Sequence, residues 1–197
     1  MRIAIDHTTL YRYSEPTRSV IQLLKVTPRS FVGQTVLDWR VDVDCDARLR
    51  EARDGYGNVV HMLYVDRPVQ RLCINVTGRV LTEDQAGRVR GLDYQLPPPV
   101  FVRATPLTRP GPAIQALADE LSAHAWVEAF VDDLGWIAFD PANGICADDA
   151  YVRVACGLDY RDAAPVAGAR AGGGSEELTV EVEVRETRRQ SQAQGQN

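Results

Sequence analysis

Two residues in the C-terminal half of the chain, His124 and Asp140, have side chains that together could support nucleophilic catalysis. A histidine oriented by a carboxylate forms two members of a catalytic triad, in which a third side chain attacks the substrate. The chain between them is dense in aromatic and charged residues. The pair therefore indicates a triad, provided that the chain also supplies a nucleophile.

A β-hairpin is the element expected to position this pair. Residues 124–130 and 136–140 are rich in aromatic and apolar side chains, and the Asp-Asp-Leu-Gly sequence of residues 132–135 suits a turn between them. The Pro-Ala-Asn-Gly sequence of residues 141–144 ends the second strand. Antiparallel pairing folds the end of the second strand back towards the start of the first. The histidine and the aspartate would then approach each other, through either a direct or a diagonal pairing.

The segment before the hairpin predicts one helix. Apolar residues recur there at the helical positions Ile114, Leu117, Ala118 and Leu121. The pattern then runs into His124 with only Ser122 and Ala123 between, and no Gly, Asn or Pro ends it. Because a helix and a strand that pack together need turn residues, this junction is where we expect a deletion.

The chain divides into two expected domains and a tail. Residues 1–103 alternate between apolar and polar types, most clearly over residues 37–45, and predict an antiparallel β-sandwich. A proline-rich connection over residues 92–112 marks the boundary to a second domain, residues 104–186. Residues 187–197 are rich in Arg, Gln and Ser and predict a disordered tail.

Two further strands are expected in the second domain. The Tyr-Val-Arg-Val sequence of residues 151–154 favours a short strand. Near the end of the chain, Leu178, Val180, Val182 and Val184 alternate with polar residues. This period of two predicts a final strand with one buried face and one exposed face.

Composition argues against several classes of function. The net charge of −5 disfavours nucleic acid and anionic membranes as partners, because both require a basic surface. No apolar run approaches the roughly 20 residues of a membrane span, and no signal-peptide pattern is visible, so we expect a cytoplasmic protein. The four cysteines form no C-x-x-C pair and show no metal-ligand spacing with the three histidines. We therefore expect free thiols, no metal and no cofactor.

Several motifs carry a family resemblance. In the first half they are His7-Thr-Thr-x-Tyr11, Thr27-Pro-Arg29 and Asp54-x-x-Gly-Asn58. In the second half they are Ala104-Thr-Pro-Leu-Thr108, His124-Ala-Trp-x-Glu128, Gly135-Trp136, Asp140-Pro-x-Asn-Gly144 and Gly157-x-Asp-Tyr160. With these motifs the chain resembles the bacterial transglutaminase-like proteins of the transglutaminase-like cysteine protease superfamily. The resemblance implies an α+β, mostly β fold, with an N-terminal antiparallel β-sandwich followed by a truncated transglutaminase-like (papain-like) α+β domain.

The resemblance also implies a chemistry, which is that of a Cys-His-Asp triad acting on a peptide bond or a glutamine carboxamide of a protein or peptide substrate. In that scheme a thiolate attacks the carbonyl carbon and His124 protonates the departing amine. Asp140 would hold the imidazole tautomer and stabilise the imidazolium. The acyl group would then pass to water or to another amine.

The nucleophile is where this sequence departs from the family. The family carries its cysteine in a Gly-x-Cys-x-Asp sequence at a helix start, upstream of the histidine, and no such segment lies between the β-domain and His124 in this chain. Cys45 and Cys73 lie in strand patterns of the β-domain, whereas Cys146 and Cys156 follow Asp140. A reactive cysteine needs a lowered pKa, typically from a helix N-terminus and a neighbouring histidine. We therefore expect no acyl-transfer activity from the chain alone, and Cys146 is the least unsuitable of the four.

Three interpretations remain open at this point. The chain is an enzyme whose nucleophile is supplied in another way, an inactive remnant with a binding or scaffold role, or a deletion product with no independent function. In the last two, His124 is a plain core or edge histidine. The missing segment would leave Trp126, Trp136 or Phe139 exposed on an uncovered sheet face, through which we expect self-association.

Overall fold

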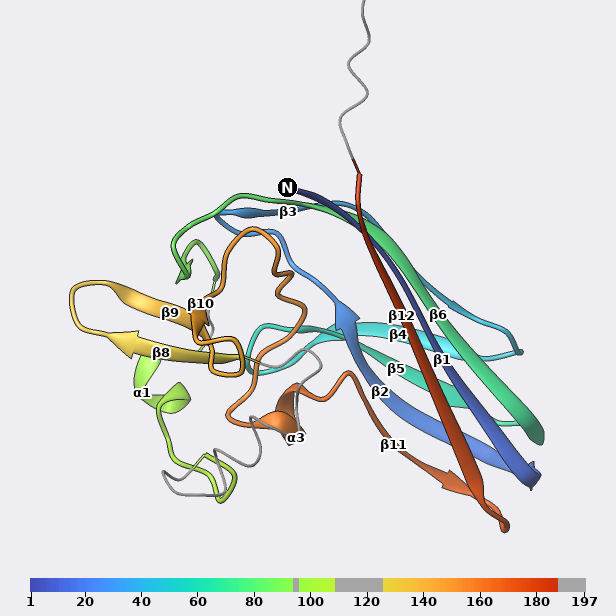
Figure 1. Ribbon diagram of the computed structural model, residues 1–197. Helices are drawn as coiled ribbons and strands as arrows, with labels where there is room; N and C mark the ends of the chain where they lie inside the picture. The colour runs from blue at the N-terminus through green and yellow to red at the C-terminus, as the bar shows by residue number, and fades with distance from the viewer. Residues whose placement is uncertain (94–95, 109–125, 188–197) are drawn as a thin grey trace, which may run out of the picture.

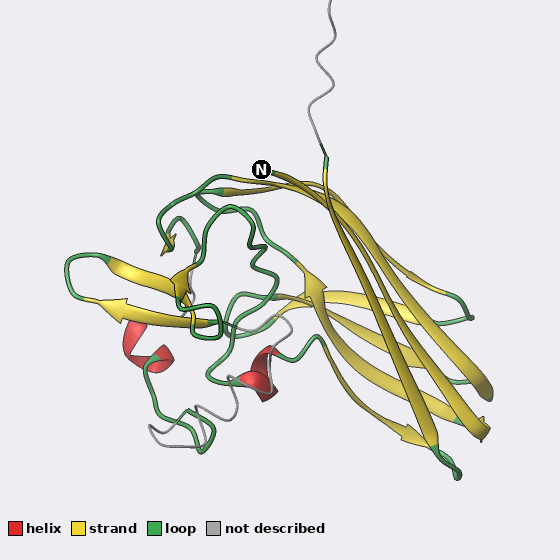
Figure 2. Cartoon of the chain, viewed as in Figure 1, coloured by secondary structure: helices red, strands yellow, loops and turns green. Residues whose placement is uncertain are grey.

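The computed structural model of the protein describes residues 1–93, 96–108 and 126–187, and these are mostly β-strand (Figures 1 and 2). The strands of the first part are β1 (Arg2–Thr17), β2 (Ser19–Thr27), β3 (Gln34–Val43), β4 (Arg48–Arg53), β5 (Val59–Val65) and β6 (Val69–Thr82). The remaining elements are β7 (Arg88–Val89), α1 (Pro98–Phe101), β8 (Val127–Val131), β9 (Gly135–Asp140), β10 (Ile145–Cys146), α3 (Tyr160–Ala163), β11 (Val166–Ala171) and β12 (Glu176–Glu186). The expected fold class, mostly β with antiparallel sheets, is confirmed.

Two antiparallel four-stranded sheets form the predicted sandwich. The first sheet has the order β12-β1-β6-β3, and the second has the order β11-β2-β5-β4. The sheets pack as two layers (Figure 1), and a core of apolar side chains lies between them. It consists of Tyr11, Tyr13, Val20, Leu24, Val26, Leu63, Val65, Leu72, Ile74 and Val76. Burial of each large apolar side chain contributes about 1.5–3 kcal/mol, so this core dominates the stability of the fold.

A tryptophan ties the two layers together near the rim of the core. Trp39 on β3 lies directly opposite Gly78 on β6, and its indole Nε1 donates a hydrogen bond of 3.0 Å to the carbonyl oxygen of Val26 in the other sheet. A Cβ atom at Gly78 would lie 2.2 Å from Trp39 Cε3. The absence of a side chain at Gly78 therefore makes the room that the indole occupies.

The predicted hairpin is confirmed for the residues that the structure describes. Strands β8 and β9 pair antiparallel, with Val127 opposite Phe139 and Phe130 opposite Trp136. In the turn between them, Asp133 and Gly135 both have positive φ angles (65° and 83°). These types are among the residues that adopt a left-handed backbone most readily, which explains why the chain turns here. Strands β7 and β10 pair with the edge of β9 that β8 leaves free, so the hairpin belongs to a small third sheet.

Two strand expectations are corrected. Residues 151–154 form no strand, and they run as irregular chain against the first sheet. The final strand exists as β12, but all of its residues are exposed on both faces. The opposite sheet ends there in β11, where Gly168 has no side chain and Arg170 turns back to bond the carbonyl oxygens of Gly173 and Gly174. Nothing on β11 therefore covers the apolar side chains of β12, which are Leu178, Val180, Val182 and Val184.

The last two strands pair with strands of the first expected domain, not with those of the second. Although they fall inside the range 104–186, β11 pairs with β2 and β12 pairs with β1, so both complete the sheets of the N-terminal sandwich. Strand pairing between distant parts of the chain places them there, which the local sequence pattern does not reveal. The predicted helix over residues 114–121 and residues 188–197 of the predicted tail lie outside the described residues. Within the described part of the chain, no helix is long and apolar enough to cross a membrane.

Candidate functional site

Asp140 ends β9 and organises the turn that follows. Its Oδ1 accepts hydrogen bonds from the backbone N–H groups of Ala142 (3.0 Å) and Asn143 (3.1 Å). Its Oδ2 accepts from the side-chain Nδ2 of Asn143 (2.7 Å) and from the hydroxyl of Tyr151 (2.6 Å). An aspartate that accepts from the backbone two and three residues ahead is the usual way in which Asp starts a turn, so the Asp-Pro-Ala-Asn sequence explains this local structure.

These four donors fill the hydrogen-bonding capacity of the carboxylate. An ionised carboxylate has about four lone-pair positions, and each oxygen of Asp140 already accepts two bonds. The hydrogen bond from Tyr151, followed by the bond from the Asn143 side chain, holds the pKa of Asp140 below its ordinary value. The carboxylate is therefore ionised and held in place by residues of its own turn and by Tyr151. An imidazole could bind it only by displacing one of these donors.

The structure does not test the predicted pairing of His124 with Asp140, because His124 lies outside the described residues. Of the two predicted site residues, Asp140 is buried at the end of β9 as expected from the hairpin. The pairing and the catalytic roles stay predictions.

Tyr151 is a site residue that sequence reasoning missed. It was expected in a strand, but its hydroxyl bonds Asp140 and its ring packs edge-on against Trp126, with 5.5 Å between ring centroids. The bond to Asp140 raises the pKa of Tyr151, because an ionised phenolate could not donate it. Its position eleven residues after Asp140 carries no sequence signal that would have predicted the contact.

A buried ion pair fixes the hairpin to the sandwich. The guanidinium of Arg153 forms two hydrogen bonds with the carboxylate of Glu128 on β8, of 2.6 and 2.9 Å. The backbone N–H and C=O of Arg153 both bond the side-chain amide of Gln34 on β3, at 2.8 and 2.9 Å. Glu128 lies on β8 and does not face solvent. Its side chain is only 16% exposed because Arg153 covers it.

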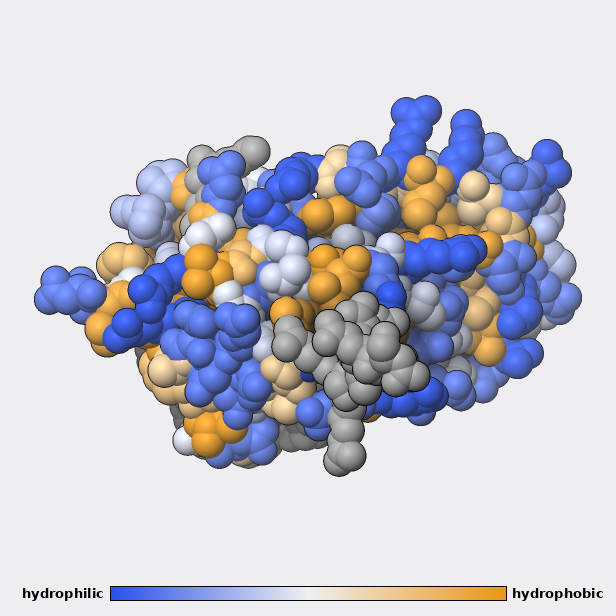
Figure 3. Space-filling view, turned by 90° about the horizontal axis from the view of Figure 1, so that it is seen from above, coloured by the Kyte–Doolittle hydropathy of each residue, from blue (hydrophilic) through white to orange (hydrophobic). Residues whose placement is uncertain are grey.

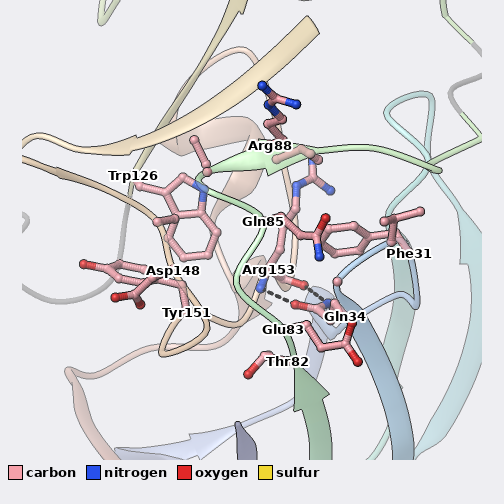
Figure 4. Close-up of a pocket in the computed structure, with 16 residues that line it drawn as sticks. Phe31, Gln34, Thr82, Glu83, Gln85, Arg88, Trp126, Asp148, Tyr151 and Arg153 are labelled. Atoms are coloured by element: carbon pink, nitrogen blue, oxygen red, sulfur yellow. Dashed lines mark hydrogen bonds between the residues drawn. The ribbon is translucent and has the colours of Figure 1, made fainter. Parts of the chain in front are cut away.

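The cavity beside this ion pair is too small for a substrate. It lies between the first sheet and the hairpin, and Figure 4 shows Trp126, Tyr151 and Arg88 on one side and Gln34 and Phe31 on the other. Its volume is about 50 Å³, far below the roughly 300–1,000 Å³ of ligand sites. The polar groups there hold the two parts of the protein together, and among the described residues this cavity leaves no room for a peptide. Within the described ranges, no three His, Cys, Asp or Glu residues are grouped so that they could hold a metal ion.

Cys146, the least unsuitable nucleophile from the sequence, points away from the aspartate. On β10, Ile145 lies opposite Asp140 and Cys146 lies opposite Phe139. Directly opposed residues in an antiparallel pair project from the same face of a sheet, and successive residues alternate. Cys146 therefore projects from the face that carries Phe139, and Asp140 projects from the other.

The other three cysteines lie in surroundings that disfavour a thiolate. Burial is the main cause that raises the pKa of Cys45, Cys73 and Cys156. The two aspartates next to Cys45 raise its pKa further, and Asp44 does the same for Cys73. A nucleophilic cysteine requires the opposite shift. These thiols are most simply structural.

One face of the hairpin is partly uncovered, although Ile137 on that face is buried. We call the side chains of Val127, Phe139 and Cys146 the outer hairpin face, because they project from the side of β8–β9–β10 opposite to Asp140 and Glu128. Val127 is 53% exposed and Phe139 is 37% exposed, and Cys146 is exposed. The inner side is better covered, since Trp136 packs against Phe130 and against the ring of Phe101 on α1. Trp126 and Trp136 are half-buried, so of the three predicted exposed aromatics only Phe139 is exposed, and only in part.

Comparison with known proteins places the first half of the chain. Residues 3–81 match the family described as the bacterial transglutaminase-like N-terminal region. An uncharacterized protein of Mycobacterium leprae is 39% identical over 62 residues, which cover 32% of this chain and 22% of that protein. An uncharacterized protein of Mycobacterium tuberculosis is 30% identical over 110 residues, which cover 55% of this chain and 31% of that protein. The matched region is therefore less than a third of the length of these curated relatives.

The fold as a whole is similar to a solved structure, that of a candidate cysteine protease from Cytophaga hutchinsonii. The TM-score is 0.55 over 94% of this chain and 90% of that chain, at 14% sequence identity, so the likeness establishes a shared fold. The family match covers β1 to β5 and nearly all of β6, and the fold likeness extends over the strands that follow. Residues 3–81 thus match the bacterial transglutaminase-like N-terminal region, and the chain as a whole shares the fold of the solved structure.

Proposed function

We propose that this chain is a non-catalytic member of its family, which has no cysteine-dependent acyl-transfer activity on its own and acts as a binding or scaffold protein. The observation that carries the proposal is the state of Asp140. Its carboxylate is saturated by Ala142, Asn143 and Tyr151, so it serves as a structural anchor of a turn.

The cysteines support the same proposal. An acyl-transfer triad needs a thiolate within reach of the general base, and the base in turn must be oriented. Cys146 projects from the wrong face of the hairpin sheet, and burial raises the pKa of the other three. The small cavity next to Trp126 gives a peptide no access to a reacting group.

Labelling with a reactive substrate analogue tests the catalytic half of the proposal. The probe is a peptide that ends in a glutamine chloromethyl ketone, and intact-mass spectrometry counts the labelled sites. We expect slow labelling of the exposed Cys146, at the rate of a free cysteine and unchanged in the variant His124→Ala. Cys146→Ser should remove this signal. Rapid labelling of one cysteine that disappears in His124→Ala would instead show a working Cys-His pair.

The binding half of the proposal rests on the outer hairpin face. The hairpin end of the molecule, at the left of Figure 3, shows apolar surface among charged side chains. On the outer hairpin face, Phe139 and Val127 lie directly opposite each other, so they form an apolar strip across two strands. A strip of this kind is self-complementary when two copies meet about a two-fold axis. We infer that two copies associate through it.

Sedimentation analysis over a range of protein concentrations tests this inference. We expect the protein to self-associate, and we expect Phe139→Glu to remain monomeric because it places a charge in the strip. Leu134→Glu is the matched control, since Leu134 is 47% exposed but lies in the turn. A protein that stays monomeric at every concentration and binds no hydrophobic dye would contradict self-association.

A further inference from the structure

The edge of the first sheet at β12 is long, regular and open. β12 has eleven residues, and its register with β1 runs without a bulge from Glu176 to Glu186. Among the described residues, β1 is its only neighbour, so the N–H and C=O groups on its other side are unpaired. Proteins usually protect such an edge with lysine, proline, a bulge or a covering segment. β12 contains no lysine or proline.

The two faces of β12 differ in chemistry. Leu178, Val180, Val182 and Val184 share the face of the sheet that carries the core residues of β1, and they are 53%, 51%, 45% and 57% exposed. We call these four residues the apolar row. The opposite face carries glutamates at positions 177, 181 and 183 and also Arg185, which pairs with Glu183, so Glu177 and Glu181 are the carboxylates without that pairing. Over its whole length the strand has five glutamates and one arginine, and thus a net charge of −4.

A second copy of this chain is a poor match for this edge. Pairing β12 with its own counterpart would bring two strands of charge −4 together, and like charges directly opposite each other are destabilising. Strand β4 is the basic edge of the second sheet, with three arginines and one glutamate. Its side chains on the core face, however, are Leu49, Glu51 and Arg53, of which only one is apolar. It could not cover the apolar row.

The features of the edge specify its partner. An added strand would satisfy the free backbone groups, and alternate side chains would then face the apolar row and the glutamates. We propose that β12 binds an extended segment of another protein in which apolar residues alternate with lysine or arginine. The apolar side chains continue the core face of the sheet beyond β12, and the basic side chains lie opposite the glutamates. Backbone hydrogen bonds supply affinity, and the two rows of side chains supply the specificity.

This surface is independent of the outer hairpin face. The hairpin face belongs to the small third sheet, whereas β12 is the edge strand of the first sheet of the sandwich, next to β1 (Figure 1). The variant Phe139→Glu should therefore bind the segment like the unaltered protein. If the protein does not self-associate through the hairpin, the proposal for β12 still stands. If β12 binds no segment, self-association through the hairpin is still possible.

A fluorescent peptide of alternating lysine and valine is the probe, and fluorescence anisotropy measures its binding to the full chain. We expect at least a tenfold loss of affinity in Val182→Lys, which places a charge in the apolar row. Ile21→Lys is the matched control, because Ile21 is 48% exposed on a strand of the other sheet and its substitution should change nothing. Circular dichroism checks that both variants fold.

Three comparisons decide the outcome. A peptide of alternating glutamate and valine should not bind, and one of alternating lysine and serine should bind at least tenfold more weakly. Hydrogen exchange of the β12 amides should slow when the lysine–valine peptide is bound, because strand addition protects them. If the lysine–serine peptide binds equally well, or if Val182→Lys and Ile21→Lys lose equal affinity for the lysine–valine peptide, the binding is non-specific charge attraction. Dimerisation without peptide that Val182→Lys abolishes would favour a second copy as the occupant, against the proposal.

Discussion

Replacing Glu128 with leucine should loosen the hairpin from the sandwich. The side chains of Glu128 and Arg153 are 16% and 9% exposed, and two short hydrogen bonds join them. Loss of one partner of a buried ion pair leaves an uncompensated charge and typically costs about 3–5 kcal/mol. Because the pair lies near the surface of the hairpin, water can partly replace the lost carboxylate, and we expect a loss of about 3 kcal/mol. For a protein of this size that corresponds to a fall of roughly 6–12 °C in melting temperature.

The double variant Glu128→Leu/Arg153→Leu separates the charge from the packing. The bonds between Arg153 and Gln34 use the backbone of Arg153, so they survive the substitution. Removing both charges should restore much of the free energy of unfolding that Glu128→Leu loses. An apolar pair of similar size often replaces a buried ion pair at little cost in stability. Thermal and urea unfolding of the wild type, both single variants and the double variant give the coupling free energy.

A small effect of Glu128→Leu would contradict a buried ion pair at this position. If Glu128→Leu lowers the free energy of unfolding by less than about 1 kcal/mol, the pair behaves like an exposed salt bridge. The same conclusion follows if the two single losses simply add in the double variant. Hydrogen exchange in β8 and β9 supplies an independent check, because a hairpin released from Arg153 should exchange faster while the core strands stay protected.

Three further outcomes follow from single contacts. Burial lowers the pKa of His61 below its ordinary 6.5, with nearby Glu51 acting in the opposite direction. The unfolded chain therefore takes up this proton first, so the stability that the neutral imidazole contributes is present above about pH 6.5 and is lost as the pH falls through the lowered pKa. Thermal melts between pH 8 and pH 5 should show this loss, and it should be smaller in His61→Gln. Tyr151→Phe removes one charge-assisted donor from the turn carboxylate and should cost about 1–2 kcal/mol in urea unfolding. Gly78→Ala forces a methyl group against Trp39 and should cost about 1–3 kcal/mol in the same assay.

The His61 and Gly78 variants each have a matched control. His7→Gln controls for the loss of a histidine in the sandwich, and an equal pH profile in both histidine variants would contradict the role given to His61. Gly55→Ala controls for the loss of glycine entropy, because the nearest atom to a Cβ there is 3.7 Å away. A Gly78→Ala protein as stable as Gly55→Ala would mean that the indole repacks freely. An unchanged acid-unfolding profile in Tyr151→Phe would mean that Tyr151 does not hold the pKa of Asp140 down.

The sequence was most informative where structure is local. The hairpin follows from two apolar runs and a turn of Asp and Gly types, and the structure confirms it, including positive φ angles at Asp133 and Gly135. The alternation of residues also predicts most strands of the sandwich. By contrast, the pairing of β12 with β1 joins segments about 170 residues apart, and no local pattern carries that information. The same alternation therefore predicted β12 correctly as a strand and wrongly as a half-buried one.

The turn at Asp140 shows why a motif and a role can separate. The sequence Asp-Pro-Ala-Asn-Gly is enough to predict a turn, because the carboxylate of Asp140 can accept from its own backbone two and three residues ahead. Those local bonds occupy Oδ1, and the side chains of Asn143 and Tyr151 occupy Oδ2. A carboxylate that orients a histidine must keep a lone pair for the imidazole. Conversion of Asp140 from a catalytic to a structural residue would thus need no change in the motif, only a donor such as the Tyr151 hydroxyl at the position that an imidazole would take.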